Sequence, residues 1–316
     1  MRIRYDFPLV TLLIVVSSIF PLVEHGYWLH VSIITMYYMI SALSWNLAAG
    51  FAGQFHFAQA AFSAVGAYAS SLIALHMGLS PWITVWIGGS FACLIGFALG
   101  SISIRLRGSY LALSSIALSE ITRRILMVEY DITRGALGLS TPPLIQTISK
   151  TPYYYIFLII LMVLTYLTYK LSSSKLGIAL RAIREDPLAA ETCGVDVTRV
   201  KVLAFTLSSF IAGLAGAFYA HYIGVISPDM STILEAATII AMVVIGGMGS
   251  IIGPIIGAGI LKPMSEIVRI YGEYNLFIYA LLVILILRFS PEGINGILSR
   301  VISKLSSYGI EGRENT

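Results

Sequence analysis

Charged residues and cysteine are scarce in this chain of 316 residues. Asp, Glu, Lys and Arg together make up 11% of it, whereas ordinary soluble domains are about a quarter charged. Hydrophobic residues make up 57%, which is more than a soluble globule could cover with polar surface. The two cysteines, Cys93 and Cys193, stand in an apolar run and in a charged segment, so we expect no disulfide between them. The composition excludes disordered, collagen-like and disulfide-stapled proteins and predicts an all-α polytopic membrane protein.

Motifs for binding nucleotides or metals are also missing. The sequence has no Gly-Lys pair and therefore no phosphate-binding loop, and Gly246-Gly247-Met248-Gly249 lacks the spacing of a dinucleotide fingerprint. No cluster of His, Cys and Asp has the spacing of metal ligands. No Ser/His/Asp set or pair of carboxylates has a pattern typical of a catalytic site. We therefore expect no enzyme, no catalytic residue, and no metal or cofactor bound by this chain. The net charge of +4 lies in loops between apolar runs, a pattern typical of membrane topology signals, so no nucleic-acid partner is expected.

Apolar runs long enough to cross a bilayer recur along the whole chain. A spanning helix needs about 20 such residues. The eighth and tenth candidate runs are short, and glycines follow the eighth at once, which leaves open a broken or re-entrant segment and a span count of eight to ten. The ten candidates are Phe7–Val23, Val31–Ala49, Phe57–Leu75, Trp82–Ile104, Tyr110–Val128, Tyr153–Leu171, Val202–Ile223, Glu235–Ile245, Ile251–Ile267 and Leu276–Phe289.

The distribution of Lys and Arg predicts the orientation of these spans. Lys and Arg concentrate on the cytoplasmic side of membrane proteins. With ten spans, both termini and the polar segment 172–201 lie in the cytoplasm, and the segment 129–151 lies outside. Four cations that fall on the outer side, Arg123, Arg124, Arg134 and Lys150, run against this rule. We thus expect one membrane-spanning domain over residues 1–316, in the plasma or inner membrane.

Small and polar residues within the spans are candidates for helix packing or for lining a pathway. Small residues four apart, as at Gly96 and Gly100, let helices approach closely, and such helices could also flank a path that opens by sliding. Ionisable groups in a membrane are costly and favour a functional role, although Glu120 has Arg123 and Arg124 on its own helix face for an ion pair. The candidates are Asn46, Gln54, Gln59, Glu120, Glu235, Gly246, Gly247, Gly249 and Gly253.

The inner segment 172–201 contains the signals of a short helix. Asp186 is a capping residue, Pro187 suits a first helical position, and Gly194 supplies a stop. A helix over Pro187–Cys193 is therefore expected on the cytoplasmic face. It is either a plain interfacial helix or a docking element for a cytoplasmic partner.

Several of these segments resemble one family. Ala189-Ala190-Glu191-Thr192-Cys193-Gly194 resembles the Ala-Ala-x-x-x-Gly core of the coupling loop in ABC-importer permeases, with Leu188 where that motif usually has Glu. Residues 181–187, 200–205 and 212–217, and the segment from Glu235 to Ser250, are similar to branched-chain amino acid permeases of the LivM type. The resemblance covers about residues 46–297 and includes 50–54 and 107–113.

The resemblance implies partners that composition cannot show. It implies a second permease subunit, in a homodimer or, more in keeping with the family, a heterodimer. It also implies two cytoplasmic ATPase subunits that use ATP and Mg, and an extracytoplasmic solute-binding protein. The cargo would be branched-chain or other hydrophobic amino acids. Arg181 and Arg184 could meet acidic groups of the ATPase or anionic lipid headgroups. The implied coupling residues are Arg181, Arg184, Pro187, Ala189, Ala190 and Gly194.

Other functions stay open at this point. The same machinery could carry urea, short amides or other amino acids. An ion-coupled secondary carrier would place carboxylates or broken helices at the bilayer midplane, and the sparse charge within the spans disfavours it. A membrane scaffold or sensor that transports nothing would leave the short inner helix without a role.

Overall fold

A computed structural model describes residues 20–21, 26–103, 108–274, 277–278, 280–281, 284 and 288, which form a bundle of helices. Within these residues, five helical stretches are long and apolar enough to cross a membrane. They coincide with the second, third, fourth, sixth and seventh predicted spans. The five are Tyr27–Phe51, Gln59–Met77, Pro81–Ile102, Thr151–Ser172 and Val197–Ile223.

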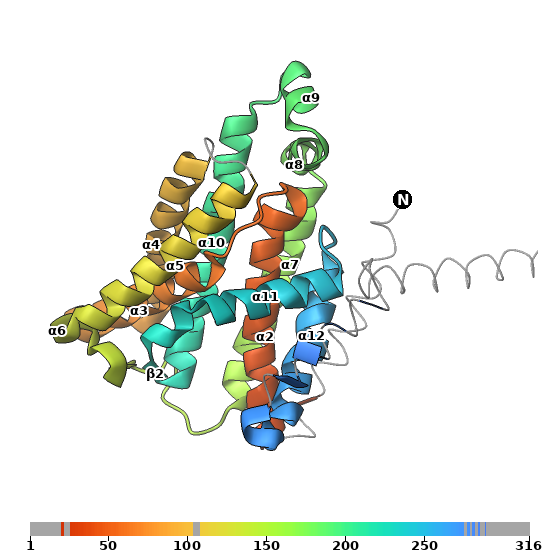
Figure 1. Cartoon of the computed structure of the whole chain (residues 1–316). Helices are drawn as coiled ribbons and strands as arrows, with labels where there is room; N and C mark the ends of the chain where they lie inside the picture. Colours follow the sequence, from red (N-terminus) through yellow and green to blue (C-terminus); the bar gives the residue numbers. More distant parts are fainter. Residues whose placement is uncertain are drawn as a thin grey trace, which may run out of the picture.

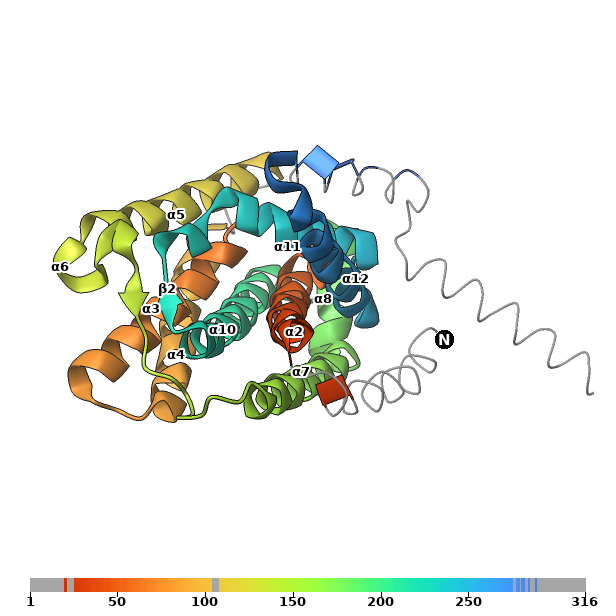
Figure 2. The same ribbon diagram turned by 90° about the horizontal axis from the view of Figure 1, so that it is seen from below.

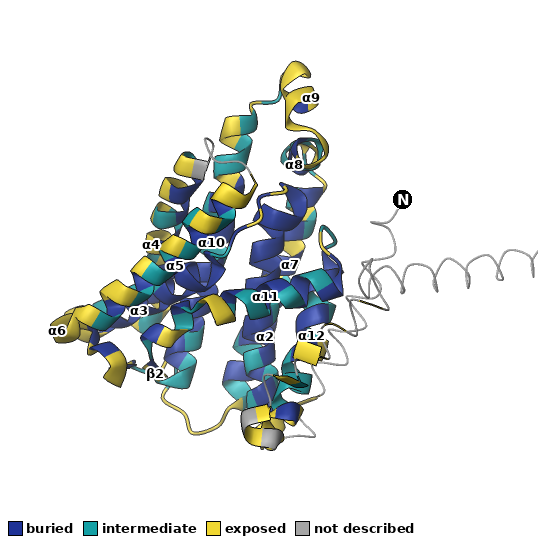
Figure 3. Ribbon diagram, in the orientation of Figure 1, coloured by how far each residue is buried: buried dark blue, intermediate teal, exposed yellow. Residues whose placement is uncertain are grey.

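Two helices form the centre of the bundle. Helix α2 (Tyr27–Trp45) continues into a π-helical turn, η2 (Asn46–Phe51), and α10 (Val197–Ile223) packs beside it. Around them stand α3 (Gln59–Met77), α4 (Pro81–Ser103) and α7 (Thr151–Ser172) (Figure 2). Most residues of α2 and α3 are buried, and so are most residues of α10 over 204–221, whereas α4 is exposed along one side (Figure 3).

Three further helices coincide with predicted spans but are shorter or more polar. Helix α5 (Ser109–Val128) carries Glu120, Arg123 and Arg124. Helix α11 (Ile233–Gly246) has 14 residues, or about 21 Å of helix, against a hydrocarbon thickness of about 30 Å. Helix α12 (Ile252–Val268) contains Pro263 and continues into η5 (Arg269–Tyr274).

The structure thus gives helices at eight of the ten predicted spans, and a total of ten stays a prediction. The predicted first span, Phe7–Val23, and last span, Leu276–Phe289, lie outside the described residues apart from isolated positions. The short length of α11 agrees with a segment that does not cross the membrane by itself.

The two polar segments lie at opposite ends of the bundle (Figure 1). At one end stand α8 (Lys175–Glu185) and α9 (Pro187–Thr192). At the other end, the segment 129–151 forms α6 (Tyr130–Thr133), η3 (Gly135–Leu137) and strand β1 (Leu139–Ser140). Strand β1 pairs antiparallel with β2 (Val225–Ile226), which η4 (Pro228–Ser231) follows. The segments after α5 and after α10 therefore share one end, as the alternating topology predicts.

Glycines let α3, α4 and α10 approach to backbone contact. A Cβ atom built on Gly66 would lie 2.2 Å from the Gly213 carbonyl oxygen, and one on Gly216 would lie 2.0 Å from that of Ser63. A Cβ on Gly96 would lie 1.8 Å from Ser209 Oγ. Real Cβ atoms never approach this closely, so only glycine fits at these positions. The predicted close packing at Gly96 is confirmed.

Large apolar side chains cover the outside of the bundle. Trp82, Trp86 and Phe97 on α4 are 46%, 57% and 55% exposed. A water-soluble protein rarely exposes a contiguous apolar surface of this kind, whereas a lipid environment requires it. The described residues therefore form part of a multi-pass membrane protein.

Candidate functional site: helices α8 and α9 and their contact with the bundle

Helices α8 and α9 are both defined by side-chain caps. The Ser174 hydroxyl accepts a hydrogen bond from the Gly177 N–H at the start of α8. The Asp186 carboxylate accepts from the N–H groups of Leu188 (2.8 Å) and Ala189 (3.3 Å) at the start of α9. Pro187 occupies the first turn, where no backbone donor is needed. The predicted short helix over Pro187–Cys193 is confirmed, and its helical residues end at Thr192.

Gly194 ends α9 in the left-handed region, with a φ of +84°. This is the backbone conformation that glycine adopts at least cost. The chain then turns back into α10, whose first helical residue, Val197, follows the Asp196 cap. The predicted stop at Gly194 is thus present.

Only part of α9 is exposed to a possible partner. Leu188 is 63% exposed and Ala189 is exposed, but Ala190 is only 5% exposed. Other residues of the chain cover the Ala190 side chain, because α9 contacts α8 and α10. The resemblance implies both Ala189 and Ala190 as coupling residues, but only Ala189 is exposed to a partner, with Leu188 beside it, and a docking face that includes Ala190 is wrong.

Arg184 connects α8 to the centre of the bundle. Its Nη1 donates a hydrogen bond to the Gly50 carbonyl in η2. A Cβ on Gly249 would lie 2.2 Å from the same nitrogen, so the guanidinium fits between η2 and the turn that joins α11 to α12. The sequence suggested lipid or a partner protein for Arg184, whereas the structure gives it an intramolecular contact. Arg181, one turn earlier, is half-buried.

Asn46 holds the turn between α11 and α12 from the other side. Its Nδ2 donates to the Ser250 carbonyl over 2.7 Å, and its Oδ1 accepts from the Gly249 N–H over 2.8 Å. The side chain is fully buried. A single π-helical turn inserts an extra residue and is frequent at functional positions. Asn46 thus binds this turn to η2 at the point where Arg184 also contacts it.

The glycines of this turn are required by close backbone contacts. A Cβ on Gly246 would lie 1.8 Å from the Gly253 carbonyl oxygen, and one on Gly253 would lie 2.4 Å from that of Gly247. Gly247 and Gly249 have φ angles of +117° and +82°. The glycines therefore serve packing and turning of the backbone, one of the two roles that the sequence suggested.

A group of buried polar side chains lies between η2 and α3. Gln59 Nε2 donates to the Ser41 carbonyl and to Ser44 Oγ, both over 3.0 Å. Gln54 is 4% exposed and His56 is fully buried. The side-chain oxygens of Gln54 and Gln59 and both ring nitrogens of His56 have no partner among the described residues. A polar group without a partner is costly to bury, so these side chains lower the stability of the described part of the bundle.

The two candidate carboxylates have structural partners. Glu120 forms ion pairs with Arg123 (3.1 Å) and Arg124 (2.7 Å) on the surface of α5. Glu235 accepts a hydrogen bond from the Tyr38 hydroxyl over 2.8 Å. The ion-pair interpretation of Glu120 is therefore correct. Among the described residues, no group of three His, Cys, Asp or Glu side chains could hold a metal ion.

Comparison with known proteins identifies the family. Residues 27–287 match the family described as "Branched-chain amino acid transport system / permease component". The chain belongs to this permease family. It is 30% identical to the high-affinity branched-chain amino acid transport system permease protein LivM of Salmonella typhimurium, over 96% of this chain and 77% of that protein. LivM of Escherichia coli is 30% identical, over 89% of this chain and 73% of that protein.

The second permease type of these systems is also similar. LivH of Salmonella typhimurium is 28% identical, over 82% of this chain and 91% of that protein. No solved structure matches the chain. The chain is thus similar to both LivM and LivH, and the resemblance to branched-chain amino acid permeases that the sequence predicts is confirmed.

Proposed function

We propose that this permease is a membrane-spanning subunit of an ATP-driven ABC importer for branched-chain amino acids, and that α8 and α9 couple it to the ATPases. One observation carries the coupling role: Arg184 of α8 contacts Gly50 in the core of the bundle, while α9, beyond it, exposes Leu188 and Ala189. A force on α9 would thus act on buried backbone. The cargo follows from the printed descriptions of the relatives.

The proposed partners lie at both ends of the bundle. The α9 end faces the cytoplasm and contacts two ATPase subunits, which bind ATP and Mg. The end with β1 and β2 faces outward and receives cargo from a solute-binding protein. A second permease subunit completes the pathway, in keeping with the similarity to both LivM and LivH. Both termini are cytoplasmic in this arrangement.

The proposed coupling route runs from α9 through three contacts. Movement of α9 displaces α8, and Arg184 transmits the displacement to Gly50 in η2. Asn46, in the same turn, then shifts Gly249 and Ser250 between α11 and α12. Coupling through packed and hydrogen-bonded elements requires an element with two arrangements. The π-helical turn is that element in this proposal.

The test is leucine uptake by the complete complex in liposomes. Uptake is expected to require ATP and the binding protein and to survive collapse of the proton gradient. Replacing Arg184 by Gln removes a charged hydrogen bond, worth about 1.5–3 kcal/mol. Uptake should fall about tenfold or more, while basal ATP hydrolysis persists without stimulation by the binding protein.

Arg181→Gln is the matched control, because it removes the same charge from the same helix. Equal loss in both variants would mean that general electrostatics, not the contact with Gly50, matters. Leucine uptake that stops with the proton gradient and ignores ATP would contradict the function itself and would favour an ion-coupled carrier.

A further inference from the structure

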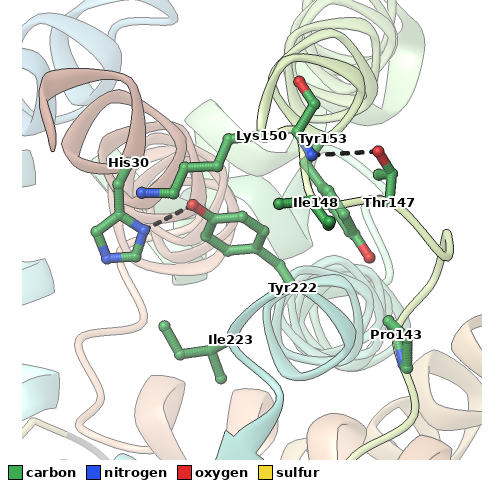
Figure 4. Close-up of a pocket in the computed structure, with 9 residues that line it drawn as sticks. His30, Pro143, Thr147, Ile148, Lys150, Tyr153, Tyr222 and Ile223 are labelled. Atoms are coloured by element: carbon green, nitrogen blue, oxygen red, sulfur yellow. Dashed lines mark hydrogen bonds between the residues drawn. The ribbon is translucent and has the colours of Figure 1, made fainter. Parts of the chain in front are cut away.

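A pocket opens at the end of the bundle opposite α9. It lies between the first turns of α2 and α7, the last turn of α10 and the segment before α7 (Figure 4). Its volume is about 320 Å³. Tyr153, Ile223 and Pro143 provide apolar walls, and His30, Tyr222 and Lys150 provide the polar groups.

The charge of this pocket is positive. Lys150 points toward His30 and Tyr222 (Figure 4). Within the described part of the chain, no carboxylate lines the pocket and no ion pair involves Lys150. Glu266, which does not line the pocket, is paired with Arg269 over 2.9 Å. The ammonium group is therefore available to an anion.

The pair formed by His30 and Tyr222 adds a hydrogen-bond donor. His30 Nδ1 and the Tyr222 hydroxyl oxygen lie 2.6 Å apart. If the Tyr222 hydroxyl donates to Nδ1, the neutral His30 ring carries its hydrogen on Nε2. If Nδ1 carries the hydrogen and donates to Tyr222, the Tyr222 O–H hydrogen is free. Either tautomer keeps one N–H or O–H for a ligand.

The first turn of α7 adds to the positive electrostatic potential in the pocket. Lys150 is the residue that precedes this 22-residue helix, and a helix N-terminus carries partial positive charge. The pocket thus offers one ammonium group, one neutral hydrogen-bond donor and a helix N-terminus. This set suits a ligand group with one negative charge and two oxygen atoms, which is a carboxylate. The apolar walls match a ligand with a hydrocarbon part, which a free inorganic anion lacks.

We propose that the pocket of His30, Lys150 and Tyr222 is a carboxylate-binding site. This inference rests on the proposed function, which puts the pocket on the side from which cargo arrives. The carboxylate belongs either to a free amino acid that enters the pathway or to an acidic side chain of the protein that delivers it. Both sources present the same group to Lys150.

The experiment compares wild type, Lys150→Met and Lys150→Arg in the complete complex in nanodiscs. In the first arm, L-leucine is titrated, with 3-methylbutylamine, which lacks the carboxylate, as the matched probe. In the second arm, affinity for the binding protein is measured at several salt concentrations. An exposed ion pair contributes about 0.2–1 kcal/mol, so Lys150→Met should weaken one interaction by up to about fivefold.

The two arms separate the two sources. Weaker binding of leucine, with binding of the amine unchanged, assigns the pocket to cargo. Weaker and less salt-dependent binding of the binding protein assigns it to an acidic side chain. Lys150→Arg should restore either interaction. If wild type imports leucine and Lys150→Met equals it in both arms, the carboxylate site is overturned and the proposed function stands. If wild type imports no leucine, the proposed function fails and this inference fails with it.

Discussion

Arg184 and Asn46 both lie at the junction between η2 and the turn that joins α11 to α12. Arg184 contacts the Gly50 carbonyl, and Asn46 contacts Gly249 and Ser250. Gly50 itself has no room for a side chain, since a Cβ there would lie 1.9 Å from Asn46 Oδ1. At the residue scale, this junction depends on glycines as much as on the polar side chains that hold it.

Gly249→Ala tests this dependence. The new Cβ would lie 2.2 Å from Arg184 Nη1, so the guanidinium must leave Gly50. The φ of +82° adds left-handed strain of about 1–2 kcal/mol. We expect a lower unfolding temperature of the purified permease in detergent and loss of stimulated ATP hydrolysis in the complex.

Gly78→Ala is the matched control for strain alone. Its φ is +63°, and a Cβ there would meet nothing within 4 Å. This variant should lose a similar amount of stability and keep stimulated hydrolysis. Normal coupling in Gly249→Ala would show that the junction at Arg184 does not transmit movement.

At the element scale, α9 is a helix of 6 residues that cannot be stable by itself, because isolated helices shorter than about 12 residues are marginal in water. It depends on the Asp186 cap, on burial of Ala190 and on the turn at Gly194. These three features hold Leu188 and Ala189 in one helical arrangement.

Asp186→Ala removes the cap. Loss of an N-cap side chain costs about 1 kcal/mol of helix stability, and here it releases the N–H groups of Leu188 and Ala189. We expect weaker copurification of the ATPase subunits and reduced leucine uptake. Membrane insertion should be unchanged, because Asp186 lies outside the helices that are long enough to span.

Asp186→Asn separates the cap from the charge. Asparagine caps a helix about as well as aspartate, so this variant should restore copurification and uptake. If Asp186→Asn is as defective as Asp186→Ala, the carboxylate itself contacts a partner and the structural explanation is wrong.

At the scale of the whole molecule, local signals predicted the helices better than the contacts between them. The Asp186 cap, Pro187 and Gly194 define α9 within a few residues, so its position was predictable. The π-helical turn at Asn46 has no comparable local signal, because it depends on Ser250 and Gly249, which are about 200 residues away. The contact of Arg184 with Gly50 and the pair of His30 with Tyr222 are likewise set by tertiary packing.

The distribution of Lys and Arg also predicts which end of the bundle faces the cytoplasm. The natural Cys193 offers a direct probe of this orientation. Its thiol is exposed at the α9 end, whereas Ile148, 103% exposed, lies on the segment before α7 at the opposite end. With Cys93 replaced by Ser, a membrane-impermeant maleimide should not label Cys193 in intact cells. It should label Ile148→Cys in a variant that also carries Cys193→Ser.

Inverted membrane vesicles should give the opposite pattern, with Cys193 labelled and Ile148→Cys protected. Because bound ATPase subunits could cover α9, the vesicles should come from cells that lack those subunits. Labelling of Cys193 from outside would place the α9 end in the extracytoplasmic space. An ATPase could not reach α9 there, so that result would refute both the predicted orientation and the coupling role, whereas the opposite pattern supports both.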